Sequence, residues 1–177
     1  MNTVIVAVAQ YLLFGLALLA GLTWLTLDRA GKVQLAVEAV LGLAVVGLGI
    51  WIAGSLHVDP RPFVQDPSTA SLFPHPADNG FPSDHAAAGG LLTALVVRHR
   101  RTVGVLVGIG AVLVAAARVA AHVHHLQDVV AGLLLGLVAG IVGILVTRIA
   151  AARLPLPGRS ETASSSARGP GQRLPGP

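Results

Sequence analysis

The feature that most constrains this chain is a series of long apolar runs separated by short polar segments. The first two runs, residues 3–27 and 33–56, are long enough to cross a hydrocarbon core of ~30 Å at a helical rise of ~1.5 Å per residue. Three more apolar runs follow, at residues 83–97, 102–121 and 126–152. With 54% hydrophobic and 11% charged residues, the chain is too apolar for a soluble globular protein. The sequence therefore predicts an all-α integral membrane helical bundle with five transmembrane helices.

The segments outside these runs divide the chain into one membrane domain, residues 1–152, and a tail. The segment 57–81 is rich in proline, so regular helix is not expected there, and it is interpreted as an extracytoplasmic loop. The third run is short for a full crossing, which predicts that it starts below the membrane surface in a polar cavity. Residues 153–177 are rich in Pro, Gly, Ser and Arg and are expected to form a disordered cytoplasmic tail.

Two smaller features concern packing inside the bundle. Gly132, Gly136 and Gly140 recur every four residues, a pattern that lets helix backbones approach closely in lipid. Glu38 lies near the beginning of the second run, and we expect it to reach the headgroups as a solvated interfacial residue.

Polar and charged residues interrupt the apolar pattern in three places: Asp59 to Phe63, Phe81 to His85, and Ala117 to Asp128. In the last segment, His124 and Asp128 are four residues apart, so they share one helix face if a helix has begun by His124. The carboxylate can then orient the imidazole. Arg118 supplies a planar cation suited to phosphate oxygens. Ionisable groups within a membrane bundle are by default functional candidates.

The order and spacing of these segments resemble the type-2 phosphatidic acid phosphatases. That family's pattern is Lys-x6-Arg-Pro, then Pro-Ser-Gly-His, then Ser-Arg-x5-His-x3-Asp. Arg61-Pro62 matches the first block, Pro82-Ser83-x-His85 the second and Arg118-x5-His124-x3-Asp128 the third. Three positions depart from the pattern, because Gly54 replaces the lysine, Ala117 the serine and Asp84 the glycine.

The resemblance implies a role for each matched residue. Neutral His124 would attack phosphorus to form a phosphohistidine, with Asp128 fixing its tautomer, while His85 protonates the leaving group and then activates water. Arg61 and Arg118 would bind the phosphoryl oxygens together with Ser83 at a helix start. These residue types can act without a metal or other cofactor, so none is expected. Loss of the lysine removes one cation and puts rate or substrate affinity in doubt.

The histidine-rich segment has two other interpretations. His122, His124, His125 and Asp128 contain groups that bind metals, but a divalent ion next to Arg61 and Arg118 would be repelled. Alternatively, the polar residues form a structural network inside the bundle. Catalysis is preferred because three motif blocks coincide. His57, His75, His122 and His125 are given no role.

The basic residues predict how the bundle is oriented. Ten of the twelve Lys and Arg residues would lie on the side of the tail, and only Arg61 and Arg118 on the other side. The positive-inside rule then places the tail in the cytoplasm and the site on the outer face of the cell inner (plasma) membrane. The formal net charge is +4, but the basic residues lie at the ends of apolar runs and not on a polar face. Nucleic acid is therefore not expected as a partner.

The Pro-Ser-Asp-His form of the second block resembles the branch that hydrolyses undecaprenyl diphosphate. The predicted function is therefore hydrolysis of a polyprenyl diphosphate to the monophosphate, with the lipid substrate and the bilayer as partners. The alternatives are a phosphatidate or phosphatidylglycerophosphate phosphatase and, from another class, a non-enzymatic lipid-phosphate binder or transporter. The sequence leaves the oligomeric state open.

Overall fold

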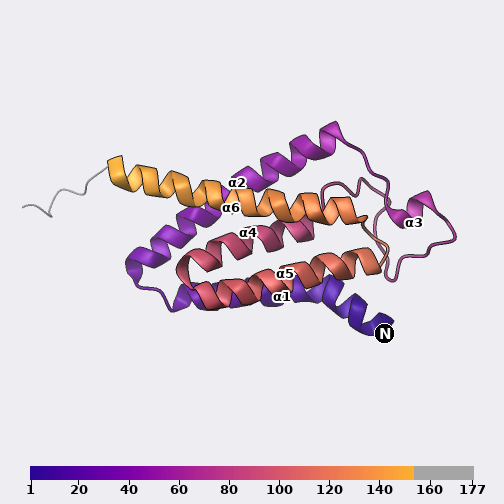
Figure 1. The fold of residues 1–177 in the computed structure, drawn as a ribbon, viewed down its shortest axis with the longest axis horizontal. Coiled ribbons are helices and arrows are strands. Elements are labelled where there is room, and N and C mark those ends of the chain that lie inside the picture. Colours follow the sequence, from indigo (N-terminus) through magenta and orange to yellow (C-terminus); the bar gives the residue numbers. More distant parts are fainter. Residues whose placement is uncertain (154–177) are drawn as a thin grey trace, which may run out of the picture.

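Every regular element in the described part of the chain is an α-helix, as the apolar runs predict. The structure is a computed structural model and describes residues 1–153. The helices are α1 Asn2–Leu25, α2 Arg29–Leu56, α3 Pro62–Gln65, α4 Asp84–His99, α5 Arg101–Ala120 and α6 Leu126–Arg153 (Figure 1). Apart from Arg153, the predicted disordered tail at residues 153–177 lies outside the described residues.

Two features differ from the expected helices by more than one or two residues at an end. The helix α2 begins at Arg29, four residues before the predicted start, because the Asp28 side chain accepts a hydrogen bond from the Gly31 N–H at 2.9 Å and caps the helix. The proline-rich loop contains one helical turn, α3, where regular helix was not expected. Pro62 occupies its first position, where a missing N–H costs nothing and the fixed φ favours a helix.

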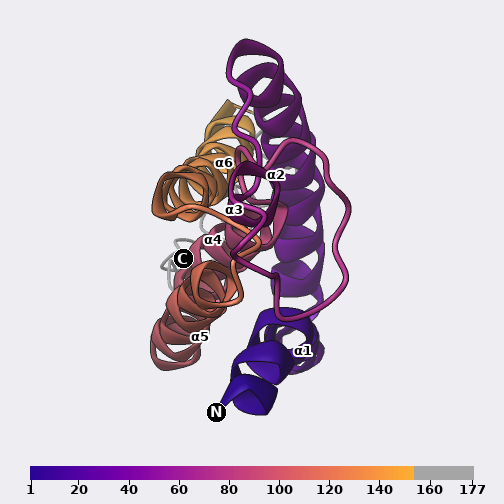
Figure 2. The same ribbon diagram turned by 90° about the vertical axis from the view of Figure 1, so that its right-hand side faces the viewer.

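Four of the helices, α1, α2, α5 and α6, are long and apolar enough to cross a membrane. Their outer faces carry large exposed apolar side chains, among them Tyr11, Phe14 and Trp51. The remaining long helix, α4, has only 16 residues. It contacts all four of these helices and lies between them when the bundle is viewed from the loop end (Figure 2). Because protein surrounds it, α4 does not need the length of a lipid-exposed span.

Small residues fix the position of α4 against α6. A Cβ added to Gly136 would overlap the backbone carbonyl of Ala87, and one added to Gly132 would overlap the carbonyl of Ser83. The backbones therefore meet without side chains between them, as the four-residue glycine spacing predicts. This contact sets the first turn of α4 beside the first turn of α6. The polar segments at the starts of these two helices are brought together as a result.

The two ends of the bundle differ in charge. The loop 57–83, the turn 121–125 and the N-terminus lie at one end, and the beginnings of α2 and α5 and the ends of α4 and α6 lie at the other (Figure 1). Within residues 1–153, the basic residues at this second end are Arg29, Lys32, Arg98, Arg100, Arg101, Arg148 and Arg153. At the loop end, the only lysine or arginine side chains in the described chain are those of Arg61 and Arg118.

Glu38 is not the solvated interfacial residue that we expected. Its side chain is fully buried and accepts hydrogen bonds from Gln34 Nε2 at 3.0 Å and His99 Nε2 at 2.9 Å. The expectation was wrong because α6 comes close to α2 at Gly143, where an added Cβ would lie 2.6 Å from the Glu38 carbonyl. This contact covers the side of α2 that carries Glu38. The buried Glu38 carboxylate thus joins α2 to α4 at the end of the bundle opposite the loop.

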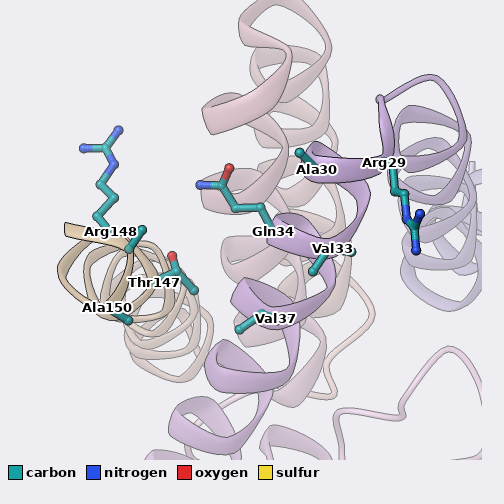
Figure 3. Close-up of a pocket in the computed structure, with 9 residues that line it drawn as sticks. Arg29, Ala30, Val33, Gln34, Val37, Thr147, Arg148 and Ala150 are labelled. Carbon is teal, nitrogen blue, oxygen red and sulfur yellow. The ribbon is translucent and has the colours of Figure 1, made fainter. Parts of the chain in front are cut away.

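A hollow of about 870 Å³ lies at this same end, between the first turns of α2 and the last turns of α6. Figure 3 shows its walls, with Val33, Gln34 and Val37 on one helix and Thr147 and Ala150 on the other. Its lining is mainly apolar and includes none of the motif residues. The predicted chemistry is therefore not located here, despite the size of the hollow.

Candidate active site

The motif residues meet in a second, smaller cavity of about 150 Å³ at the loop end of the bundle. The side chains that line it are Arg61, His75, Asp78, Asn79, Pro82, Asp84, His85, Arg118 and His124. Arg61 precedes α3, His85 lies in the first turn of α4, Arg118 in the last turn of α5, and His124 in the turn between α5 and α6. Four predicted residues from distant parts of the sequence thus share one cavity.

The environment of His124 determines which of its ring nitrogens faces the cavity. Its Nε2 lies 3.3 Å from a terminal nitrogen of Arg61 and 3.2 Å from one of Arg118. Arginine can only donate hydrogen bonds, so Nε2 must be the unprotonated nitrogen. The proton is then on Nδ1, which donates to the Gly80 carbonyl at 3.0 Å. The lone pair suited to nucleophilic attack therefore points between the two guanidinium groups.

The protonation state of His124 is also controlled by its surroundings. Only 3% of the His124 surface is exposed. Burial, together with the positive charges of Arg118 and Arg61, lowers the pKa of His124, and the nearby Asp128 carboxylate opposes this only in part. At neutral pH the imidazole is therefore uncharged, which is the form in which it can act as a nucleophile.

Each arginine is held in place by other groups. Arg61 donates from Nε to Asp78 at 2.8 Å and from a terminal nitrogen to the Val123 carbonyl at 2.7 Å. The Arg118 guanidinium lies 5.8 Å from the centre of the Phe73 ring and donates to His75 Nε2 at 2.9 Å. The two guanidinium groups converge on His124 Nε2 and repel each other. A phosphoryl group between them would relieve this repulsion and accept their hydrogen bonds.

Asp128 lies behind His124, although the helix that was expected to align them starts later than required. The helix α6 begins at Leu126, so His124 precedes it and Asp128 lies in its first turn. The fully buried carboxylate accepts a hydrogen bond from the His125 N–H at 2.8 Å and lies 3.4 Å from His124 Nδ1. The pair thus forms through a turn and a helix start instead of one continuous helix face.

Ser83 is positioned at the start of α4 but does not line the cavity. It is fully buried, its side chain accepts a hydrogen bond from the Ala86 N–H at 3.5 Å, and its own N–H donates to the Asp128 carbonyl at 3.0 Å. Ser83 is therefore the N-cap of α4 and connects α4 to α6. Its direct contact with phosphate remains a prediction.

One group of potential metal ligands is present among residues 1–153, and it differs from the one considered from the sequence. One ligand atom each from Asp59, His125 and Asp128 lie within 4.8 Å of one another. His122 is not part of this group, and its Nδ1 lies 3.1 Å from the Ala70 carbonyl. His125 Nδ1 lies 3.3 Å from Asp59, a separation at which the two can form an ion pair without a metal. The expectation that no metal is required remains a prediction.

Sequence reasoning did not identify four residues that line the cavity, namely His75, Asp78, Asn79 and Asp84. Of these, only Asp84 was marked by a pattern in the sequence, because it stands where the family motif has glycine. The other three come from the proline-rich loop, whose path over the helix ends has no periodic pattern. Asn79 shapes this path, since its side chain donates to the carbonyls of Gly54 and His57 at 3.1 and 3.0 Å.

Comparison with known proteins identifies the family. The model of the PAP2 superfamily matches residues 35–151, which contain all three motif blocks. The bacitracin transport permease protein BcrC of Bacillus licheniformis is 32% identical over 141 residues, which are 80% of this chain and 69% of that protein. The putative undecaprenyl-diphosphatase YbjG of Escherichia coli is 34% identical over 152 residues, 84% of this chain and 73% of that protein.

A solved structure has a similar arrangement of helices. The crystal structure of LpxE from Aquifex aeolicus superimposes with a TM-score of 0.66 at 21% identity, covering 81% of this chain and 85% of that one. At this identity the likeness concerns the fold. The family match extends over most of the chain and includes every motif position around the cavity. This protein therefore belongs to the PAP2 superfamily and is a membrane hydrolase of the lipid-phosphatase class.

Proposed function

We propose that this protein hydrolyses a polyprenyl diphosphate, such as undecaprenyl diphosphate, to the monophosphate through a phosphohistidine intermediate. The observation that carries the reaction type is the unprotonated Nε2 of His124, which faces the cavity between Arg61 and Arg118. The substrate class is supported by YbjG, a relative named as a putative undecaprenyl-diphosphatase, and by the Pro-Ser-Asp-His form of the second motif.

In the first step, the lone pair of His124 Nε2 forms a bond to the terminal phosphorus, and the bond from phosphorus to the bridging oxygen breaks. His85, which carries a proton once the anionic diphosphate is bound, donates that proton to this oxygen, and the lipid monophosphate leaves. Arg61 and Arg118 bind the phosphoryl oxygens throughout, and Asp128 stabilises the imidazolium that forms on His124.

In the second step, water attacks the phosphohistidine. His85, now neutral, takes a proton from the water, the new oxygen–phosphorus bond forms and the nitrogen–phosphorus bond breaks. Inorganic phosphate leaves, and both histidines return to their initial states. The sum is diphosphate plus water giving monophosphate plus phosphate, and the chain supplies every proton carrier without a metal.

The orientation of the enzyme forms part of the proposal. The end of the bundle opposite the cavity carries all the basic residues of the described chain except Arg61 and Arg118. The positive-inside rule then places that end in the cytoplasm and the cavity at the outer face of the plasma membrane. A polyprenyl diphosphate exposed at the outer leaflet would reach the cavity from the lipid phase.

Phosphate release from a panel of lipids in detergent tests this function. We expect turnover of undecaprenyl diphosphate to exceed that of phosphatidate and phosphatidylglycerophosphate, to persist in chelator, and to be lost in His124→Ala and His85→Ala. A preference for a glycerolipid would replace the substrate that we propose. Unchanged phosphate release in both variants would favour a binder or transporter, and loss of activity in chelator would require a metal, for which Asp59, His125 and Asp128 are the candidates.

A further inference from the structure

The cavity has too little fixed positive charge for the anion that the proposed function requires it to bind. Its lining contains two arginines, Arg61 and Arg118, and two carboxylates, Asp78 and Asp84. These four charges cancel. The diphosphate substrate is strongly anionic, so additional positive charge would have to come from the three histidines that line the same cavity.

The position where the family pattern has a lysine does not supply this charge. Gly54 lies in α2, and its carbonyl accepts a hydrogen bond from Asn79 Nδ2 at 3.1 Å. A Cβ at this position would lie 3.2 Å from the Phe81 carbonyl. Residue 54 is therefore packed against the segment 79–81, and as a glycine it carries no side chain that could reach the cavity.

Two of the three histidines already have other tasks in the proposed reaction. His124 has to be neutral to attack phosphorus, and His85 has to release its proton to the leaving group. The third, His75, lies on the loop and lines the cavity. Its Nε2 lies 2.9 Å from a terminal nitrogen of Arg118, and its ring centre lies 6.3 Å from that of His124. It is therefore close enough to contact the same phosphoryl group.

His75 can change its protonation state when phosphate binds. Its Nε2 accepts the hydrogen bond from Arg118 and is therefore unprotonated in this arrangement. Burial and the charges of Arg61, Arg118 and His124 lower the pKa of His75 in this state. The other titratable groups that face it across the cavity are Asp78, Asp84 and His85. A bound phosphate anion attracts the Arg118 N–H group, releases Nε2 and favours the imidazolium.

We propose that His75 is a third phosphate-binding cation, which becomes protonated when substrate binds, donates a hydrogen bond from Nε2 to a phosphoryl oxygen and replaces the lysine absent at position 54. This inference rests on the proposed function, because it concerns the phosphate of that substrate. It makes His75 a substrate-binding residue, while His124 and His85 carry the bond-making and proton-transfer steps.

Three substitutions of His75 distinguish a role as a phosphate-binding cation from a role that only positions Arg118. His75→Ala removes both the hydrogen bond with Arg118 and the proposed contact with phosphate. His75→Gln can still accept the hydrogen bond from Arg118 but cannot become charged, and His75→Lys keeps the charge but cannot accept. His57→Ala is the matched control, because His57 is an exposed histidine of the same loop that does not line the cavity.

The measurements are KM and kcat for the lipid diphosphate in detergent between about pH 5 and 8. We expect KM to rise by about tenfold to a hundredfold in His75→Ala and His75→Gln, with kcat changed by less than about threefold. In the wild type and the His57→Ala control, KM should increase as the pH rises and His75 loses its proton. In His75→Lys, KM should stay low and change little with pH in this range.

A KM in His75→Gln equal to that of the wild type at every pH would overturn the proposal, because only the contact with Arg118 would then matter. A His75→Lys variant as impaired as His75→Ala would also overturn it. Calorimetric binding of inorganic phosphate to the His124→Ala protein needs no turnover. Weaker phosphate binding after adding His75→Ala supports the proposal even if no lipid on the panel is hydrolysed, whereas unchanged binding contradicts it.

Discussion

Replacing Asp128 with asparagine should slow phosphoenzyme formation without abolishing it. The substitution removes a negative charge and preserves the shape of the side chain, and the asparagine oxygen can still accept the hydrogen bond from the His125 N–H. His124 Nδ1 keeps its hydrogen bond to the Gly80 carbonyl at 3.0 Å, so the reactive tautomer is retained. What is lost is the charge that, in the proposed mechanism, stabilises the imidazolium formed on His124.

The size of the effect follows from the distance between the two groups. Full unit charges separated by the 3.4 Å between Asp128 and His124 interact by about 5 kcal/mol at an effective dielectric constant of about 20. If roughly half of the imidazolium charge has developed in the transition state, the loss is about 2 to 3 kcal/mol, which corresponds to a rate reduced roughly 30- to 150-fold.

Single-turnover measurements with labelled lipid diphosphate and rapid quenching give the rate of phosphoenzyme formation directly. The matched control is Asp66→Asn, a change to an exposed loop carboxylate that does not line the cavity, and it should leave this rate unaltered. Thermal unfolding in detergent checks that both variants are folded. A loss beyond about 10⁴-fold would mean that the carboxylate, and not Gly80, fixes the tautomer. A loss below about threefold would mean that its charge is not used.

Two further predictions concern the bundle and its orientation. Gly136→Ala should destabilise the protein by about 1 to 3 kcal/mol in detergent unfolding, because the new Cβ overlaps the backbone of α4, while Gly47→Ala, where a Cβ meets nothing within 4 Å, should be neutral or slightly stabilising. Equal unfolding midpoints for the two variants would contradict the close packing of α4 and α6. A tag at the N-terminus should be labelled from outside intact cells, and labelling from the cytoplasmic side alone would reverse the proposed orientation.

Much of the fold followed from elementary properties of the sequence. In lipid, backbone groups have to form hydrogen bonds within the chain, so long apolar runs become helices wherever they occur. Glycines repeated every four residues similarly predict close contacts between helices, as Gly132 and Gly136 show against α4. The helix boundaries were less accurate where a local hydrogen bond decided them, as Asp28 does for the start of α2.

The candidate site was predictable to the extent that its residues belong to motifs. Arg61, His85, Arg118 and His124 were identified by their match to the family motifs, and all four line the cavity. His75 and Asp78 were not, because they lie on a loop with no periodic pattern. The hydrogen-bond partner of Glu38 could not be predicted either, because His99 is 61 residues away in the sequence and the contact depends on how α2 and α4 pack.

The sequence by itself therefore determined which segments enter the bilayer, at which end the polar motifs gather, and which residue types are available for phosphate chemistry. These properties depend on transfer of each segment from water to lipid and on covalent spacing, which are local. Only the tertiary structure decided that His124 presents Nε2 to the cavity, that the Gly80 carbonyl holds Nδ1, and that His75 contacts Arg118. Those properties depend on the direction of individual lone pairs and hydrogen bonds, which are fixed only when distant segments pack together.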